Sequence, residues 1–170
     1  MRDADGVPLR VQITLSKGRG QAQAQNAILK GRDLAGFCAL SSPQTRALDT
    51  ARLALAGLDK EIVPEPALSE IGLGDWAGRT RADLLAQTKA RDGFDLYDLA
   101  PGGEGLQALH TRCTQFLKQL EQPTIVITHG MTSRMLRLIL TGRPIADLRQ
   151  ISGGQGVVFH LCNGNQERLI

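Results

Sequence analysis

The sequence predicts an α/β protein of three layers, α/β/α, with helices on both faces of a mostly parallel central sheet. Helix and strand signals alternate along the whole chain of 170 residues, as they do where each parallel strand needs a crossover helix. The strongest strand, residues 124–128, is apolar on both faces, which is typical of an interior parallel strand. No repeat, low-complexity tract or Ser/Gly-rich linker interrupts the pattern. We therefore expect one domain over residues 1–170, with an atypical segment at 1–17.

The first elements follow from short-range patterns. Residues 8–15 alternate apolar and polar side chains, which favours a strand. Residues 18–30 are rich in Gln and Ala and are followed by Gly31, which indicates a helix and its end. Residues 36–41 form a short apolar run, which predicts a buried strand.

A second helix and a weak strand come next. Ser42 is a favoured N-cap and Pro43 a favoured first-turn residue, so a helix is predicted from here to about Gly57. Residues 61–63 are predicted as a weaker strand, because two prolines close it.

The middle of the chain is richer in turn formers. Residues 68–78 surround Trp76 with glycines and show no clean period, so an ordered loop is predicted. A helix is expected at 79–90 and a polar connection at 92–98, before the turn at 101–103.

The last third has the clearest signals. Apolar residues recur at helical spacing and predict an amphipathic helix; they are Leu106, Leu109, Cys113, Phe116, Leu117 and Leu120. The strand at 124–128 runs straight into His129, and a helix follows at 132–140. Residues 156–161 and 167–170 flank an Asn-Gly turn, which predicts a terminal hairpin at the sheet edge.

Composition excludes several classes of function. The formal charge is only +3, and 4% of the residues are aromatic, which disfavours a nucleic-acid partner. No run of 18 apolar residues occurs and the chain begins with polar residues, so neither a membrane span nor a secretion signal is expected. The three cysteines lie far apart, without Cys-x-x-Cys spacing. We expect a cytoplasmic protein with reduced cysteines, no cofactor and no metal.

Three polar side chains lie where strands end or ordered loops begin. Ligands of open α/β sheets bind at the carboxyl ends of strands, where helix N-termini also point. Arg46 lies in the first turn of a predicted helix, and His129 ends the apolar strand before Gly130. Glu70 lies between apolar neighbours in the glycine-rich loop, where it is placed to act as a general acid. Taken singly, each has a plainer interpretation: a surface ion pair, a satisfied core histidine and an ordinary loop carboxylate.

Four sequence blocks combine these residues. Residues 41–51 are SSPQTRALDTA, residues 68–78 LSEIGLGDWAG, residues 101–105 PGGEG and residues 125–130 IVITHG. In this order the blocks resemble the motifs of the histidine phosphatase (phosphoglycerate mutase-like) superfamily: S-S-P-x-x-R-A-x-x-T-A, L-x-E-x-x-x-G-x-W-E-G, P-G-G-E-S and a strand ending in S-H-G or T-H-G. Alanine replaces the second glutamate of the second block, and glycine replaces the serine of the third.

The resemblance implies a role for each side chain. Arg46 would bind the phosphoryl group, Glu70 would be the proton donor and His129 would hydrogen-bond the phosphoryl oxygens. The resemblance also implies a phosphatase that acts on small phosphomonoesters through a phosphohistidine. Its ligand would be a small phosphorylated metabolite or inorganic phosphate. The short spacing from Glu70 to His129 favours a phosphatase over a mutase. The unpaired hairpin edge would also allow a homodimer.

One family feature is absent from the sequence. Family members begin with a strand ending in Arg-His-Gly, whose histidine is the nucleophile. The chain contains only His110, His129 and His160. Of these, His110 falls in the long predicted helix and His160 in the hairpin, so no nucleophile is assigned.

Two explanations stay open. In the first, the start is misplaced and truncates the chain, with residues 2–14 as the loop that follows the lost strand. In the second, residues 8–15 replace that strand. We favour the first, because a helix at Gly18 leaves no room for the family's usual loop. In either case this polypeptide cannot form the usual phosphohistidine; the alternative function is a catalytically inactive, phosphate- or phosphometabolite-binding pseudo-phosphatase.

Overall fold

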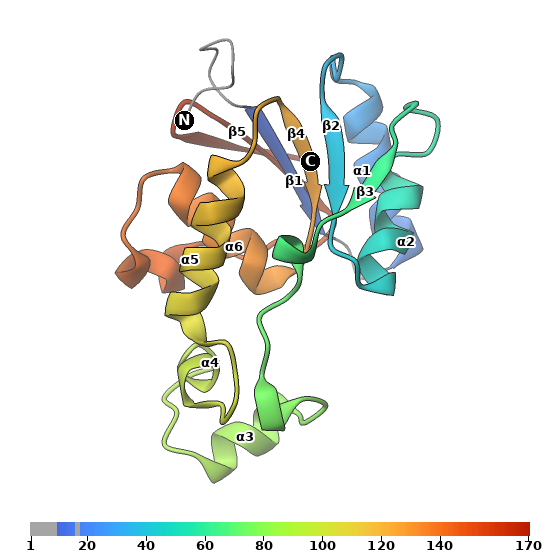
Figure 1. Ribbon diagram of the computed structural model, residues 1–170. Helices are drawn as coiled ribbons and strands as arrows, with labels where there is room; N and C mark the ends of the chain where they lie inside the picture. Colours follow the sequence, from blue (N-terminus) through green and yellow to red (C-terminus); the bar gives the residue numbers. More distant parts are fainter. Residues whose placement is uncertain (1–9, 16–17) are drawn as a thin grey trace.

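The computed structural model describes residues 10–15 and 18–170, and within them six strands form one sheet in the order β3-β2-β4-β1-β5-β6 (Figure 1). The strands are β1 (Arg10–Leu15), β2 (Cys38–Ser41), β3 (Ile62–Pro64), β4 (Thr124–Ile127), β5 (Val157–Cys162) and β6 (Asn165–Leu169). The first four pair in parallel, whereas β5 and β6 pair antiparallel to their neighbours. The prediction of a mostly parallel sheet is confirmed.

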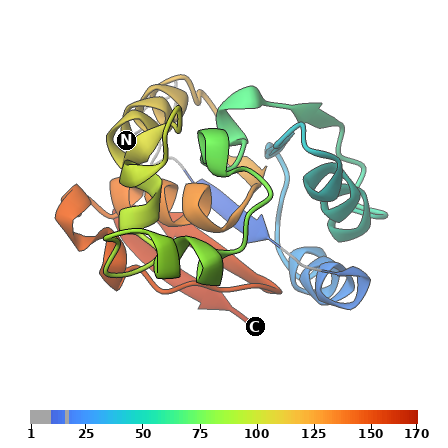
Figure 2. The ribbon, with the colours of Figure 1, turned by 90° about the horizontal axis from the view of Figure 1, so that it is seen from below.

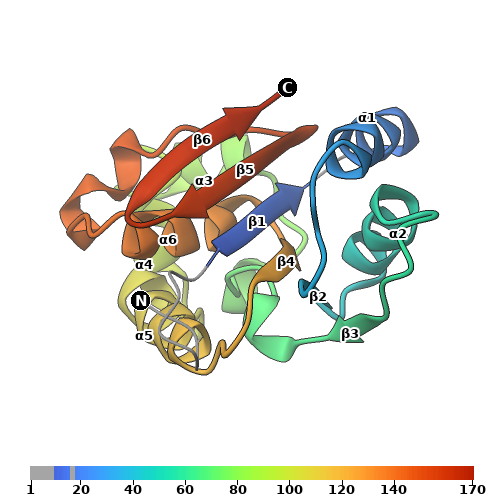
Figure 3. The ribbon, with the colours of Figure 1, turned by 90° about the horizontal axis from the view of Figure 1, so that it is seen from above.

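Helices cover both faces of this sheet, as the views from below and above show (Figure 2, Figure 3). They are α1 (Arg19–Lys30), α2 (Thr45–Ala54), α3 (Arg81–Gln87), α4 (Asp95–Leu99), α5 (Gly105–Lys118) and α6 (Gly130–Leu140). On β4, Ile125 and Ile127 join the core beneath α1 and α2, while Val126 joins the core beneath α5 and α6. Since both faces of β4 are buried, the strand has to be apolar throughout.

The bounds of three helices differ from the sequence prediction: α3 covers Arg81–Gln87 instead of 79–90, and α2 and α6 differ as follows. α2 begins at Thr45 with Gln44 as its N-cap residue, so Ser42 as N-cap is wrong. The Ser42 hydroxyl accepts a hydrogen bond from the Gln44 N–H at 3.3 Å, ahead of the helix, and lies 2.8 Å from a ring nitrogen of His129. α6 begins at Gly130, two residues earlier than predicted.

The N-terminal strand occupies the middle of the sheet. β1 pairs in parallel with β4 and antiparallel with β5, and Val11 and Ile13 are fully buried against the α5 and α6 side. The strand predicted from the alternation at 8–15 is thus confirmed for residues 10–15. The truncation hypothesis placed residues 2–14 in a loop. For residues 10–14 this is wrong, because they lie in a strand whose Val11 and Ile13 side chains are part of the core. Residues 1–9 and 16–17 lie outside the described residues.

The remaining elements agree with the sequence, apart from one helix. The hairpin turn has Asn163 at φ 52° and Gly164 at φ 75°, the left-handed pair that a two-residue turn requires. α4 was not predicted; it forms because the Asp92 carboxylate accepts hydrogen bonds from the backbone N–H groups of Phe94 and Asp95. No helix in the described part of the chain is long and apolar enough to cross a membrane.

Candidate active site

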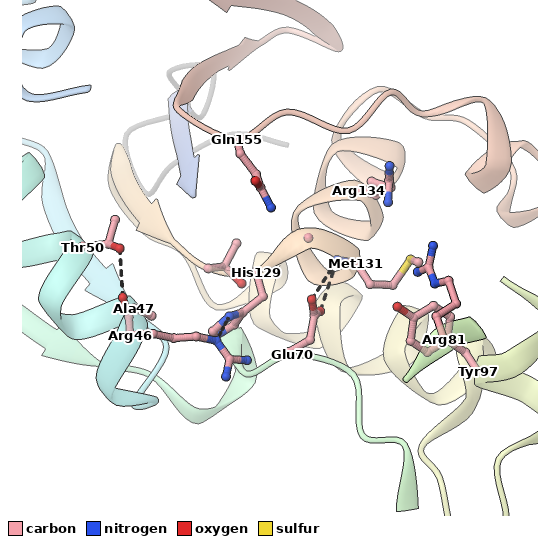
Figure 4. A pocket seen from close by; sticks show the side chains of 12 residues that line it. Arg46, Ala47, Thr50, Glu70, Arg81, Tyr97, His129, Met131, Arg134 and Gln155 are labelled. Atoms are coloured by element: carbon pink, nitrogen blue, oxygen red, sulfur yellow. Dashed lines mark hydrogen bonds between the residues drawn. The ribbon is translucent and has the colours of Figure 1, made fainter. Parts of the chain in front are cut away.

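A cavity of about 320 Å³ lies where β2 and β4 end (Figure 4). Arg46 from α2, Glu70 from the loop after β3, and His129 directly after β4 all line it. The structure therefore brings the three predicted site residues together. Parallel pairing of β2 with β4 explains this, because it places the carboxyl ends of both strands at one edge. Neither His110 on α5 nor His160 on β5 lines the cavity.

His129 is held through both ring nitrogens. The Nε of Arg46 donates to Nδ1 at 3.2 Å, and Nε2 lies 2.8 Å from the Ser42 hydroxyl. Because an arginine Nε always donates, Nδ1 is unprotonated and Nε2–H donates to Ser42. Burial lowers the pKa of His129 below its ordinary value, Glu70 raises it and Arg46 lowers it further. The imidazole is therefore neutral at pH 7 in the ligand-free pocket.

Glu70 holds the N-terminal end of α6. Its Oε1 accepts hydrogen bonds from the backbone N–H groups of Met131 and Thr132, at 3.2 and 3.1 Å, and from the Thr132 hydroxyl at 3.2 Å. Its Oε2 accepts from the Met131 N–H alone, at 3.2 Å. A carboxylate at this position complements the positive end of the helix dipole. The bonds orient Glu70 beside His129, with Oε2 the less occupied oxygen.

The loop that carries Glu70 is held by its backbone carbonyls. The Arg112 Nη1 donates to the carbonyls of Ala67, at 2.6 Å, and Ser69, at 3.1 Å. Along another edge of the same guanidinium, Nε and Nη2 donate to the two carboxylate oxygens of Glu104, at 2.7 and 2.8 Å. The hydrogen bonds that Arg112 donates to Glu104 raise the pKa of Arg112. The Pro-Gly-Gly-Glu block thus positions Glu70 through Arg112, a function for which sequence spacing offered no signal.

The far side of the cavity contains groups that sequence reasoning missed. Arg81 from α3, Tyr97 from α4, Arg134 from α6 and the exposed Gln155 also line it (Figure 4). They come from separate segments, and no motif links them. Among the described residues, no group of three or more His, Cys, Asp or Glu side chains is arranged to hold a metal ion.

Comparison with protein families agrees with this geometry. The model of the histidine phosphatase superfamily (branch 1) matches residues 11–168, which is nearly the whole chain. The chain belongs to the histidine phosphatase superfamily. The resemblance inferred from the four sequence blocks is confirmed.

Histidine phosphatase relatives include both phosphatases and mutases. The adenosylcobalamin/alpha-ribazole phosphatase of Salmonella typhimurium is 33% identical over 162 residues, which cover 87% of this chain and 78% of that protein. A 2,3-bisphosphoglycerate-dependent phosphoglycerate mutase of Beijerinckia indica is 34% identical over 140 residues, which cover 74% of this chain and 68% of that protein.

Solved structures show the same fold. A structure titled mycobacterial hydrolase 1 superposes with a TM-score of 0.80 at 21% identity, covering 96% of this chain and 97% of the other. The alpha-ribazole phosphatase of Shigella flexneri gives a TM-score of 0.76 at 22% identity, covering 95% of each chain. The three-layer α/β/α architecture is therefore that of the superfamily.

Proposed function

We propose that the cavity binds the phosphoryl group of small phosphomonoesters, the substrate class of a phosphoglycerate mutase-like phosphatase. The observation that carries this is the direct bond between Arg46 and a neutral His129 inside a cavity of about 320 Å³. Among the described residues that line the cavity, Glu70 is the one carboxylate, and it accepts its hydrogen bonds from the start of α6, not from Arg46 or His129. Two nitrogen-rich groups thus face the cavity without a carboxylate partner, an arrangement suited to an anion.

Binding a phosphoryl group would rearrange this pair. The guanidinium of Arg46 would turn from His129 to two phosphoryl oxygens, because planar paired donors match that geometry. Nδ1 of His129 would then be free, and the dianion beside it would favour proton uptake there. A protonated Nδ1 donates to a third oxygen, while Ser42 keeps the ring in place through Nε2.

Glu70 would protonate the leaving group. In the superfamily's in-line mechanism a P–N bond forms as the ester P–O bond breaks, and an acid protonates the departing alkoxide. Glu70 would carry that proton on Oε2, since Oε1 already accepts from α6 and the Thr132 hydroxyl. A Cβ at position 130 would lie in contact with Oε2, at 3.7 Å. Because residue 130 is glycine, this side of the oxygen stays accessible.

A second function, binding without turnover, is favoured by the histidine content. The full sequence has three histidines, and among the described residues only His129 lines the cavity. His129 is bonded on both nitrogens and serves the electrophilic side of the reaction. Without a nucleophilic imidazole, this polypeptide would hold a phosphomonoester and release it unchanged.

Calorimetric titration with inorganic phosphate tests the binding site. We expect binding by the wild type and at least tenfold weaker binding by Arg46→Ala, since charged hydrogen bonds contribute about 1.5 to 3 kcal/mol each. Arg52→Ala is the matched control on the same helix: Arg52 pairs with Asp49 on the surface and does not line the cavity. No phosphate binding by the folded wild type would overturn the proposal.

An aryl phosphate assay separates the two functions. Negligible turnover together with phosphate binding supports the non-catalytic function for this polypeptide. Turnover at the rate of an ordinary phosphatase, abolished by His129→Ala, would contradict it and would imply an unrecognised nucleophile.

A further inference from the structure

A glycine-rich segment just before β5, residues 152–156, borders the cavity; we call it the glycine strap. It reads Ser-Gly-Gly-Gln-Gly. Its residue Gln155 lines the cavity together with Arg46 and His129, and in Figure 4 the Gln155 side chain lies above His129 and Glu70 and points toward them. The amide of Gln155 makes no hydrogen bond to another of the described residues. The glycine strap therefore presents unused N–H donors to whatever the cavity holds.

Buried side chains fix the backbone at both ends of the glycine strap. At its start, Nη2 of Arg137 on α6 donates to the carbonyl of Ser152 at 2.5 Å. Directly after its end, Nε2 of Gln25 on α1 donates to the carbonyl of Val157 at 3.2 Å. Arg137 is 1% exposed and Gln25 is fully buried. Because close packing leaves such side chains little room to move, the backbone on either side of Gln155 has a defined position.

Arg137 is an unusual residue for the interior of the protein. It is a buried cation without a carboxylate partner among the described residues. Its guanidinium lies 3.9 Å from the centre of the Phe159 ring and donates to Oε1 of Gln166 at 3.2 Å. Burial lowers the pKa of Arg137 to about 10, which reflects the cost of keeping a charge in the core. The hydrogen bond to Ser152 is the contact that connects this costly residue to the cavity.

The glycine strap also fits closely against its neighbours. A Cβ at Gly154 would come 2.9 Å from Cζ of Phe159, which is itself 1% exposed. Gly156 has φ 73°, a conformation that other residues rarely adopt. Since Phe159 stacks on Arg137 as well, one buried ring supports both the glycine strap and the arginine that holds it.

We propose that Gln155 donates a hydrogen bond from Nε2 to the phosphoryl group held by Arg46 and His129, and that Arg137 is the positioning residue that keeps Gln155 at the cavity. A phosphoryl dianion accepts hydrogen bonds and donates none, so the amide turns its nitrogen toward the ligand. The glycine strap thus adds a neutral donor from a different part of the chain. This inference rests on the proposed function of the phosphoryl site.

Calorimetric titration with inorganic phosphate at constant ionic strength tests the contact. Gln155→Ala should bind about tenfold more weakly than wild type, the factor expected for one hydrogen bond to a charged acceptor. Gln155→Glu keeps the size of the side chain but sets a negative charge against the phosphate, so its affinity should fall about thirtyfold or more. Gln122→Glu is the matched control: the same change at an exposed residue before β4 and outside the cavity should leave the affinity within about twofold of wild type.

A double-mutant cycle tests the positioning role of Arg137. Arg137→Met keeps much of the stem but removes the donor to the Ser152 carbonyl. We expect it to weaken phosphate binding about fivefold when Gln155 is present and less than about twofold in the Gln155→Ala background, since it acts through Gln155. Gly154→Ala, which pushes the glycine strap away from Phe159 but leaves Arg137 in place, should give the same pattern and replaces Arg137→Met in the cycle if that variant does not fold.

The outcomes separate the two proposals. Phosphate affinities of Gln155→Ala and Gln155→Glu that both equal that of wild type overturn the contact and leave the phosphoryl site intact. Equal losses with and without Gln155 overturn the positioning role, because a general structural defect weakens both backgrounds alike. If the folded wild type does not bind phosphate, or Arg46→Ala binds it as well as wild type does, the proposed function fails and this inference fails with it.

Discussion

Replacing Arg112 by methionine should destabilise the protein more than any surface arginine change. The substitution keeps most of the aliphatic stem but removes the guanidinium that joins Glu104 to two carbonyls of the glutamate loop. The carbonyls of Ala67 and Ser69 lose a charged donor, and Glu104 loses its partner. The expected cost follows from these contacts.

Each charged hydrogen bond contributes about 1.5 kcal/mol at the low end of measured values, so the two carbonyl contacts amount to about 3 kcal/mol. The pair with Glu104 is bidentate and its side chains are only 24% and 21% exposed, so the two carbonyl contacts give the lower end of the loss. The Ser69 carbonyl also keeps its bond from the Thr132 hydroxyl at 2.7 Å. We therefore expect a loss of about 3 kcal/mol, which lowers Tm by about 6 to 12 °C in a chain of this size.

Thermal and urea unfolding, followed by circular dichroism, measure this loss. Arg52→Met is the matched control: it removes an ion pair with Asp49 whose side chains are 65% and 59% exposed, so a change below about 0.5 kcal/mol is expected. If Arg112→Met shifts Tm no more than Arg52→Met does, the hydrogen bonds from Arg112 do not hold the glutamate loop in solution and the reasoning is refuted.

Two further predictions concern a glycine and the site histidine. At Gly74, φ is 48° and a Cβ would lie 2.1 Å from the Pro101 carbonyl oxygen, so Gly74→Ala should cost about 3 kcal/mol from backbone strain and overpacking. Gly78→Ala, at φ 83° with open space around it, should cost only about 1 kcal/mol in the same urea titrations, and equal losses would contradict the clash. Burial lowers the pKa of His129 below 6.5, so the unfolded chain binds this proton more readily than the folded one, and wild type should lose stability relative to His129→Gln as the pH falls from 7.5 to 5. A difference in unfolding free energy that stays constant over this range would show that His129 titrates normally in the folded protein.

Much of the fold was predictable because its signals are local or periodic. The alternation on β1, the apolar run of β4 and the Asn-Gly turn each specify their element within a few residues, and Val11, Ile13 and all of β4 are buried as these patterns predict. The motifs also placed Arg46, Glu70 and His129 at strand ends, and parallel pairing brings such ends together. The predicted start of α2 was wrong: the Ser42 hydroxyl bonds to the Gln44 N–H ahead of the helix and also to His129, 87 residues away in the sequence.

The sequence by itself determined the layer architecture, the superfamily motifs and the three residues proposed to handle a phosphoryl group. Only the tertiary structure showed that both nitrogens of His129 are engaged, that Arg112 secures a loop 43 to 45 residues before it in the chain, and that Arg81 and Arg134 face the same cavity. The reason is physical: a hydrophobic period determines which face of an element is buried, but it does not state which distant polar groups meet. Those meetings depend on how the strands pair and where the helices cross, and they decide what the cavity can bind.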